Sequence, residues 1–451
     1  MNIFTLIRQK SKTRPDQLAY SNVEEEVGLT YRELVARAEK TAAWLVERGC
    51  NAGDRCGLIL EDGSEFLTTA LGILAAGLCL VPIATFLPED EQEYVLRTAR
   101  LHWLYGRERN LVRTAYVGPI DGANDENFRA CNPAYIRFTS GTTGRRKGIL
   151  LGRKAIIDRL NAANAVLGIH SNDLIWFALP MVDHFVVSIL LYLSRGATIL
   201  DVSKTVSART FASHPTVIYG APGFFETLIR SEIGSLDRLR LAISTTAPLP
   251  AQVAANFAGR FGKSVNPALG IIEVGLLSIN MRTDKVGSVG RPMPAYDIML
   301  LAEDGEPAEP GRTGELYVKG PGLLDAYIGP WRPAPQLMNP YGYPTGDFAS
   351  VDADGYLFLA GRGKSRLLVN GVEFFCEEVE MALNSLPGVA ESRVFLDRIS
   401  QTLSAELVGS PGPTERLGEM LTGLIDSRKV PKSFVIVRDL PRTSNGKLRR
   451  G

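Results

Sequence analysis

A loop rich in glycine, serine and threonine has the residue types that point most directly to chemistry. Residues 138–148 read FTSGTTGRRKG and follow the apolar stretch Ala134–Phe138. Glycines let backbone N–H groups approach phosphate oxygens closely, hydroxyl groups add donors, and Lys147 adds a cation. The spacing is not that of a Walker A loop, G-x-x-x-x-G-K-[ST], which disfavours a P-loop kinase or NTPase. The segment predicts a phosphate-binding loop of another kind, between a strand and a helix over Lys154–Leu167.

Further short motifs follow this loop along the chain. They are Gly270–Glu273, Gly287–Pro292, Gly314–Leu316, Tyr343–Asp347, Gly361–Lys364 and Asn445–Lys447. In this order they resemble the signatures of the adenylate-forming superfamily, which comprises acyl- and aryl-CoA synthetases, adenylation domains of peptide synthetases and firefly luciferase. The resemblance extends from about Leu29 to Lys447 and covers nearly the whole chain.

The resemblance implies an ATP-dependent ligase that works in two steps. A carboxylate attacks the α-phosphate of Mg-ATP to give an acyl-adenylate and pyrophosphate. The acyl group then passes to the thiol of coenzyme A or of a carrier protein's phosphopantetheine. Charge builds on the transferring phosphoryl group, so catalysis needs positioned cations and donors. ATP and Mg²⁺ are therefore the expected cofactors. The alternatives are an amine or hydroxyl acceptor, and a non-catalytic relative that binds a nucleotide or a carrier protein.

The same resemblance assigns roles around the nucleotide. Glu273 would bind Mg²⁺, a hard cation that prefers carboxylate oxygen. Asp347 would accept both ribose hydroxyls with Arg362 nearby, and Lys447 would bridge the carboxylate and the α-phosphate. The expected nucleotide-binding residues are Thr139, Ser140, Gly141, Thr142, Thr143, Gly144, Lys147, Gly270, Asp347 and Arg362. The expected catalytic residues are Thr139, Glu273 and Lys447. Without the resemblance, the charged residues have ordinary alternatives: a turn cap, a solvated charge, or a disordered basic tail.

The acid pocket is expected to begin at residues 180–185, PMVDHF. Counted back from Gly196, Asp183 falls where amino-acid-activating relatives keep an ammonium-binding aspartate. Counted forward from Pro180, His184 falls where aryl- and acyl-activating relatives keep a histidine, asparagine or aromatic residue. A further alternative is that Asp183 caps the following helix. The remaining lining is expected from Tyr219, Gly220, Thr245, Thr246 and Leu269. A small pocket with aromatic and polar walls favours a small aryl or amino acid over a long fatty acyl chain.

Two positions depart from the family pattern beside the nucleotide. Leu269 stands where an aromatic ring normally lies against adenine, and Ile272 stands where a threonine hydroxyl normally contacts phosphate. Loss of the ring and of the hydroxyl is expected to cost about 1–2 kcal/mol of nucleotide interaction, which corresponds to roughly tenfold weaker ATP binding.

The second half-reaction of most relatives follows a rotation of a small C-terminal domain. In this sequence Lys364 would be the hinge, and Asn370 and Gly371 would line the thiol channel. Gly371 suits close approach of the backbone. The expected division is an adenylation core over residues 1–361 and a mobile C-terminal lid over residues 362–451.

Hydrophobic patterning supplies the elements that must position these residues. Thr30 and Glu33 form a capping box before an amphipathic helix. Apolar strands then alternate with helices, one of them expected over Val186–Leu193, as far as Ala251–Phe261. This alternation predicts an α/β fold with parallel sheets covered on both faces. Turn residues crowd in after Gly287 and predict a β-rich subdomain, followed by a small α+β domain. The apolar run Phe66–Thr85 contains glycine and proline and is expected to be a buried helix followed by a buried strand.

Composition excludes several other classes. Lys and Arg total 50 and Asp and Glu total 49, so the net charge of +1 disfavours nucleic acid or an anionic membrane as a partner. The five cysteines are widely spaced, without C-x-x-C, which disfavours disulfides and zinc and favours reduced thiols. The first residues are too polar for a signal peptide. A cytoplasmic location is expected.

Overall fold

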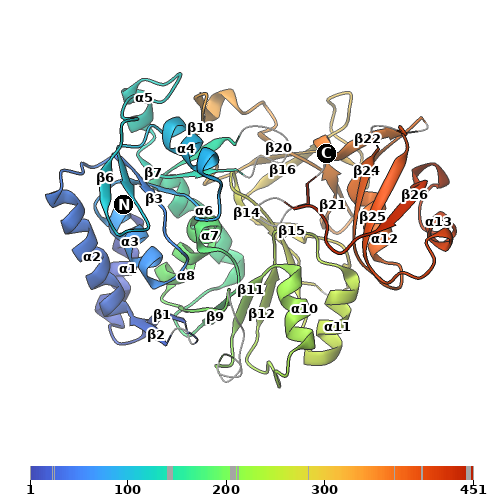
Figure 1. Cartoon of the computed structure of the whole chain (residues 1–451), viewed down its shortest axis with the longest axis horizontal. Helices are drawn as coiled ribbons and strands as arrows, with labels where there is room; N and C mark the ends of the chain where they lie inside the picture. The colour runs from blue at the N-terminus through green and yellow to red at the C-terminus, as the bar shows by residue number, and fades with distance from the viewer. Residues whose placement is uncertain are drawn as a thin grey trace.

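Two large mixed sheets form the body of the chain in a computed structural model (Figure 1). The structure describes residues 2–22, 24, 26–139, 146–203, 210, 213–282, 284–369, 371–397, 400–442 and 448–449. The first sheet has nine strands, and the six in its centre, from β13 to β1, run parallel. In spatial order they are β15 (Arg291–Pro292), β14 (Gly275–Ile279), β13 (Asn266–Ile271), β12 (Leu241–Ser244), β11 (Val217–Gly220), β9 (Leu174–Phe177), β10 (Thr198–Asp201), β1 (Leu18–Asn22) and β2 (Val27–Thr30).

The second sheet has eight strands with a parallel centre, from β7 to β5, and antiparallel strands on either side. In spatial order they are β19 (Arg332–Pro333), β18 (Ala326–Ile328), β8 (Gly148–Gly152), β7 (Pro133–Phe138), β4 (Cys79–Pro82), β3 (Arg55–Leu58), β5 (Trp103–Tyr105) and β6 (Leu111–Arg113). The prediction of parallel sheets is confirmed.

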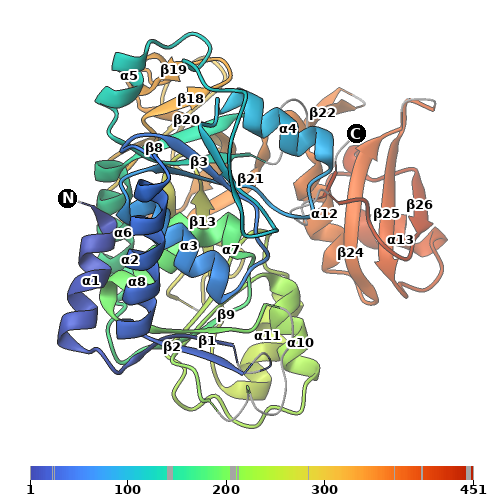
Figure 2. The ribbon, with the colours of Figure 1, turned by 60° about the vertical axis from the view of Figure 1, so that its left-hand side comes forward.

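Helices cover both faces of both sheets (Figure 2). The layer between the sheets shares one hydrophobic core with them and consists of α1 (Ile3–Thr13), α2 (Tyr31–Glu47), α3 (Ser64–Ala75), α6 (Arg153–Leu167) and α8 (Leu190–Arg195). The outer face of the nine-stranded sheet packs against α10 (Pro222–Arg230) and α11 (Ala251–Phe261). The outer face of the eight-stranded sheet packs against α4 (Glu89–Thr98) and α5 (Asp125–Ala130). Strands buried on both faces explain the near-continuous apolar runs of the sequence.

Two local predictions are confirmed in this layer. Thr30 Oγ1 accepts a hydrogen bond from Glu33 N at 3.2 Å, and the Glu33 carboxylate accepts one from Thr30 N at 2.8 Å, so the capping box starts α2. The apolar run Phe66–Thr85 forms α3 and then β4, and both are buried. Among the described residues no helix is long and apolar enough to cross a membrane.

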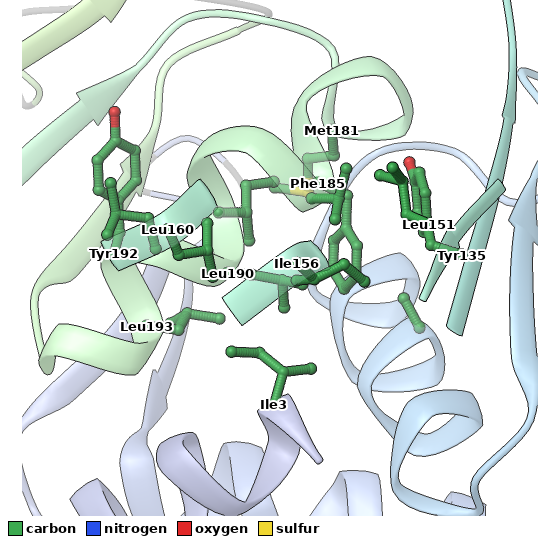
Figure 3. Close-up of a cluster of buried hydrophobic side chains, with 14 of the residues drawn as sticks. Ile3, Tyr135, Leu151, Ile156, Leu160, Met181, Phe185, Leu190, Tyr192 and Leu193 are labelled. Atoms are coloured by element: carbon green, nitrogen blue, oxygen red, sulfur yellow. The ribbon is translucent and has the colours of Figure 1, made fainter. Parts of the chain in front are cut away.

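The helix expected over Val186–Leu193 is interrupted. A short helix α7 (Met181–His184) leads into a π-helical turn, η1 (Phe185–Ile189), before α8 begins. The ring of Phe185 stacks on Tyr135 with centroids 6.4 Å apart and meets the edge of Phe66 at 6.0 Å. Figure 3 shows Phe185 and Met181 in this cluster beside Tyr135. The packing anchors the π-helical turn, a feature that often occurs at functional sites.

A β-rich part follows, as predicted. It is an antiparallel sheet of β16 (Asp297–Leu301), β17 (Gly314–Lys319), β20 (Tyr343–Val351) and β21 (Leu357–Arg362). A 3-10 turn, η3 (Gly363–Ser365), leads into the C-terminal elements, which lie to one side of the two-sheet body in Figures 1 and 2. They are β22 (Arg366–Val369), β23 (Val372–Phe375), α12 (Cys376–Asn384), β24 (Val389–Leu396), β25 (Leu403–Gly409), α13 (Glu415–Thr422), η4 (Ser427–Lys429) and β26 (Ser433–Ile436). They have a hydrophobic core of their own. The domain boundary at 361/362 stays a prediction.

Candidate active site

The residues expected to line the acid pocket lie at one edge of the nine-stranded sheet. Tyr219 and Gly220 end β11, Thr245 and Thr246 follow β12, and Leu269 lies in β13. Helix α7, with Asp183 and His184, follows β9. The carboxyl ends of neighbouring parallel strands meet at the same edge, which is where open α/β sheets bind their ligands. The tertiary structure therefore brings these seven residues to one edge of the sheet.

His184 and Tyr219 form the polar part of this edge. His184 Nδ1 lies 3.1 Å from Tyr219 Oη, and the two rings meet edge to face with centroids 5.5 Å apart. Tyr219 also stacks on Phe177 at 5.7 Å and meets the edge of Tyr192 at 6.1 Å. Burial raises the pKa of Tyr219, so its hydroxyl stays neutral near pH 7.

Asp183 faces the other sheet. Its carboxylate lies 2.7 Å from the guanidinium of Arg137 in β7, and both side chains are largely buried. Asp183 does not start α7 but is its third residue. Asp62 instead accepts hydrogen bonds from the first two N–H groups of the helix, Met181 at 2.8 Å and Val182 at 3.3 Å. Burial raises the pKa of Asp62 to about 6. Asp62 and Arg137 were not predicted as residues of this site, because no local motif marks either one.

The glycine-rich loop joins two antiparallel strands. We expected it to connect a strand to a helix, but β8 lies between the loop and α6, with Phe138 of β7 opposite Gly148 of β8. An apolar run as short as GILLG cannot be assigned to strand or helix from periodicity alone. Thr139 N donates to the carbonyl of Lys147 at 2.9 Å, and Lys147 N donates to Thr139 Oγ1 at 3.2 Å, so the base of the loop is closed. Ser140, Gly141, Thr142, Thr143 and Gly144 lie outside the described residues.

Opposite charges meet around the ring of Tyr327. Its hydroxyl donates to Glu273 Oε1 at 2.9 Å. The ammonium of Lys147 lies 5.1 Å from the centroid of the ring, and the guanidinium carbon of Arg332 lies 5.5 Å from it. The pKa of Lys147 is lowered, first by burial and then by the charges of Arg332 and Lys364, while Glu273 opposes the change. Two cations, Lys147 and Arg332, and one carboxylate meet around this ring, an arrangement that suits a polyphosphate. No local motif marks Tyr327 or Arg332.

Glu273 fits the Mg²⁺ that the family implies. Magnesium in nucleotide sites is commonly held by one or two carboxylates together with substrate phosphates. The described part of the chain holds no group of three or more histidine, cysteine, aspartate or glutamate side chains placed to bind a metal ion. The backbone around Glu273 is fixed, because the buried Arg159 donates to the carbonyls of Ile272 (2.9 Å) and Gly322, and Leu324 N donates to the carbonyl of Glu273 at 2.7 Å.

Asp347 and Arg362 are cross-strand neighbours in β20 and β21. Arg362 Nε donates to Asp347 Oδ1 at 2.8 Å, and Thr345 Oγ1 accepts a hydrogen bond from Asp347 N at 3.1 Å. Only 6% of the surface of Asp347 is exposed. Asp347 is therefore a buried, oriented carboxylate within a strand and is not a solvated turn cap.

The remaining predicted residues are more dispersed. Gly270 is exposed beside a bulge in β13, and Lys364 lies in η3. Gly371 lies at the tip of the β22–β23 hairpin with a φ of +74°, a backbone conformation that favours glycine. Asn370 and Lys447 lie outside the described residues. The chain on either side of Lys447 is held by a bridge between Arg442 and Leu448.

Known proteins resemble this chain in sequence and in fold. The family model of the AMP-binding enzymes matches residues 7–328. The chain is 27% identical to feruloyl-CoA synthase from Amycolatopsis sp. over 94% of this chain and 93% of that protein. It is also 27% identical to a linear gramicidin synthase from Brevibacillus parabrevis over 97% of this chain, which spans only 6% of that much longer protein. Among solved structures, ATP-bound MatB from Rhodopseudomonas palustris superposes with a TM-score of 0.86 at 25% identity, over 99% of this chain and 97% of that one.

Proposed function

Since this chain belongs to the AMP-binding enzyme family of adenylate-forming enzymes, we propose that it joins a small aryl acid to a thiol with ATP. The observation that carries the proposal is the meeting of Lys147 and Glu273 at Tyr327, next to a closed loop base at Thr139. Cations and a carboxylate at that place match the needs of Mg-ATP. The buried carboxylate of Asp347, held by Arg362, would supply a fixed acceptor for a ribose.

The chain's own groups account for the first step. Thr139 and Lys147 would hold the β- and γ-phosphates, so that charge on the departing pyrophosphate is stabilised as it forms. Glu273 would hold Mg²⁺, which adds positive charge at the phosphates. Asp347 would fix the ribose. The C-terminal Lys447 would bring the acid's carboxylate and the α-phosphate together. The role of Lys447 rests on the family resemblance alone, and the geometry of the described residues supports the roles proposed for the others.

The edge of the nine-stranded sheet favours an aryl acid over an amino acid. The Asp183 carboxylate already has the Arg137 cation beside it, which removes the reason for a ligand ammonium to bind there. The His184–Tyr219 pair and the aromatic stack on Phe177 suit a flat ring with a polar substituent. The similarity to feruloyl-CoA synthase along nearly its whole length supports the same choice, and supports coenzyme A as the acceptor.

A rotation of the C-terminal elements about Lys364 would switch the site from the first half-reaction to the second. We place the boundary of this lid at residues 361/362, before the last residue of β21 and ahead of η3 and the C-terminal core. In the second step Asn370 and Gly371 would lie along the path of the thiol. Peptide-synthetase relatives make a carrier protein the second candidate for the acceptor.

ATP–pyrophosphate exchange with the wild-type chain tests the first step. The panel should pair cinnamic-type and benzoic-type acids with α-amino acids and short aliphatic acids. We expect exchange with at least one aryl acid, and formation of its thioester when coenzyme A is added. Exchange with no acid would reject the ligase and favour a non-catalytic relative. Exchange without a thioester would point to a carrier protein, an amine or a hydroxyl as the acceptor.

A Lys447→Ala variant tests the division between the two steps. It is expected to lose adenylate formation and to keep thioester formation from supplied acyl-adenylate. Equal loss of both reactions would contradict the role given to Lys447.

A further inference from the structure

The hydroxyl of Tyr327 belongs to a directed hydrogen-bond chain. Tyr327 Oη lies 2.9 Å from Glu273 Oε1 and 2.5 Å from Tyr343 Oη. An ionised carboxylate only accepts hydrogen bonds, so Tyr327 donates its single proton to Glu273. Tyr343 must then donate to Tyr327. The order Tyr343, Tyr327, Glu273 is therefore fixed, and it holds one oxygen of the carboxylate in place.

The ring of Tyr327 has a second set of neighbours. Strand β18 pairs with β8 and β19, which puts Tyr327 opposite both Ile149 and Arg332. Ile149 is two residues from Lys147, and the Lys147 ammonium lies 5.1 Å from the ring centroid. A cation within about 6 Å of an aromatic face is attracted to it. The register of three strands thus sets the distance between the ring and the phosphate-loop lysine.

Both phenols are buried. Tyr327 is 7% exposed and Tyr343 is 5% exposed, so little water competes for their hydrogen bonds. The chain is a permanent feature of the folded site.

We propose that Tyr327 is a positioning residue of the nucleotide site, with its hydroxyl orienting Glu273 for Mg²⁺ and its ring holding the Lys147 ammonium for the phosphates. This inference rests on the proposed function, because it takes Mg-ATP as the ligand. The two halves of the side chain have separate tasks. They can therefore be removed one at a time.

Calorimetric titration with ATP, in Mg²⁺ and in EDTA, separates the two tasks. Tyr327→Phe removes the hydroxyl and keeps the ring. The factor by which Mg²⁺ improves ATP affinity should therefore be about tenfold smaller than in wild type, while ATP affinity in EDTA should stay within about twofold of the wild-type value. Tyr343→Phe should also reduce the improvement in ATP affinity that Mg²⁺ gives, by a smaller factor than Tyr327→Phe does. Tyr327→Leu also removes the ring and should weaken ATP binding in EDTA about fivefold. Tyr327→Met is the substitute if the leucine variant melts more than about 5 °C below wild type.

Tyr116→Phe is the matched control. Tyr116 lies on the loop after β6, and its Oη donates to Glu93 Oε1 at 3.2 Å. The substitution therefore removes a hydrogen bond between the same two residue types, but outside the site. It should leave both ATP affinities unchanged. A wild-type Mg²⁺ effect in Tyr327→Phe would overturn the role of the hydroxyl. A wild-type affinity in EDTA for the variant without the ring would overturn the role of the ring. Failure of the proposed function is a different result, because wild type itself would then show no acid-dependent exchange.

Discussion

The guanidinium of Arg137 lies 2.7 Å from the carboxylate of Asp183 and links strand β7 of one sheet to helix α7 at the edge of the other. One register of the sequence predicts Asp183 at the position where a relative that activates amino acids would bind the substrate ammonium. Here the cation comes from the protein. The same contact fixes the position of α7. His184, the residue after Asp183, lies within hydrogen-bond distance of Tyr219.

Replacing Arg137 with methionine should widen the range of acids. The variant leaves Asp183 without its cation, so an α-amino acid should gain at least tenfold in relative kcat/KM against its desamino analogue, since tenfold equals about 1.4 kcal/mol. The measurement is ATP–pyrophosphate exchange with matched pairs of acids. Arg129→Met, an exposed arginine in α5, is the control. An unchanged ratio would show that Asp183 does not face the acid.

Replacing Asp347 with asparagine should weaken the binding of every ligand that contains the ribose. Hydrogen bonds to a charged group contribute about 1.5–3 kcal/mol, so we expect AMP and ATP to bind at least about tenfold more weakly, by similar factors. Calorimetry with both nucleotides measures this. Asp352→Asn is the control, because Asp352 pairs with Lys285 at 2.7 Å in the turn that follows β20. Loss of ATP affinity alone would place Asp347 at the phosphates.

Replacing Lys147 with methionine should affect ATP and AMP unequally, unlike the change at Asp347. It removes the cation of the loop and keeps the length of the side chain, so ATP and pyrophosphate should bind about tenfold more weakly while AMP is spared. Lys154→Met, a largely exposed lysine paired with Asp158 on α6, is the control. Equal weakening of AMP would contradict a contact with the outer phosphates.

Asp62 should make stability fall as pH rises. Its folded pKa of about 6 lies above the ordinary value of 3.8, so unfolding releases a proton between those limits and the free energy of unfolding decreases across them. Asp62→Asn keeps an acceptor for Met181 N and cannot ionise. From pH 4 to pH 7, wild type should lose about 2–2.5 kcal/mol more than the variant, measured by urea unfolding. Parallel curves for the two proteins would count against a buried Asp62.

Thr246 should be replaceable by glycine with a gain in stability. Its φ is +77°, and a β-branched residue in that conformation is strained by about 1–3 kcal/mol. Glycine relieves the strain at a smaller entropic cost, so Thr246→Gly should raise the melting temperature. Thr245→Gly should lower it, because Thr245 is buried and has no positive φ. A lower melting temperature for both variants would show that the Thr246 side chain makes compensating contacts.

Much of the architecture was accessible from local patterns. The helix Ala251–Phe261 and the capping box at Thr30 occur where patterning placed them. Two local predictions were wrong. The segment GILLG forms β8 between the loop and α6, where a helix was expected to follow the loop directly. The segment after Met181 contains a π-helical turn and is not one continuous helix. Both segments are short and apolar, so their periodicity carries too little information to decide between alternatives.

The family, the α/β class and the order of the motifs could all be read from the sequence, because they depend on residue types at short spacing. Which distant groups meet became known from the folded chain. Tyr327 reaches Glu273 across 54 positions, Asp183 reaches Arg137 across 46, and Asp62 reaches Met181 across 119. Sheet order and strand register set these meetings. They arise from burial of apolar faces over the whole chain, and no local pattern specifies them.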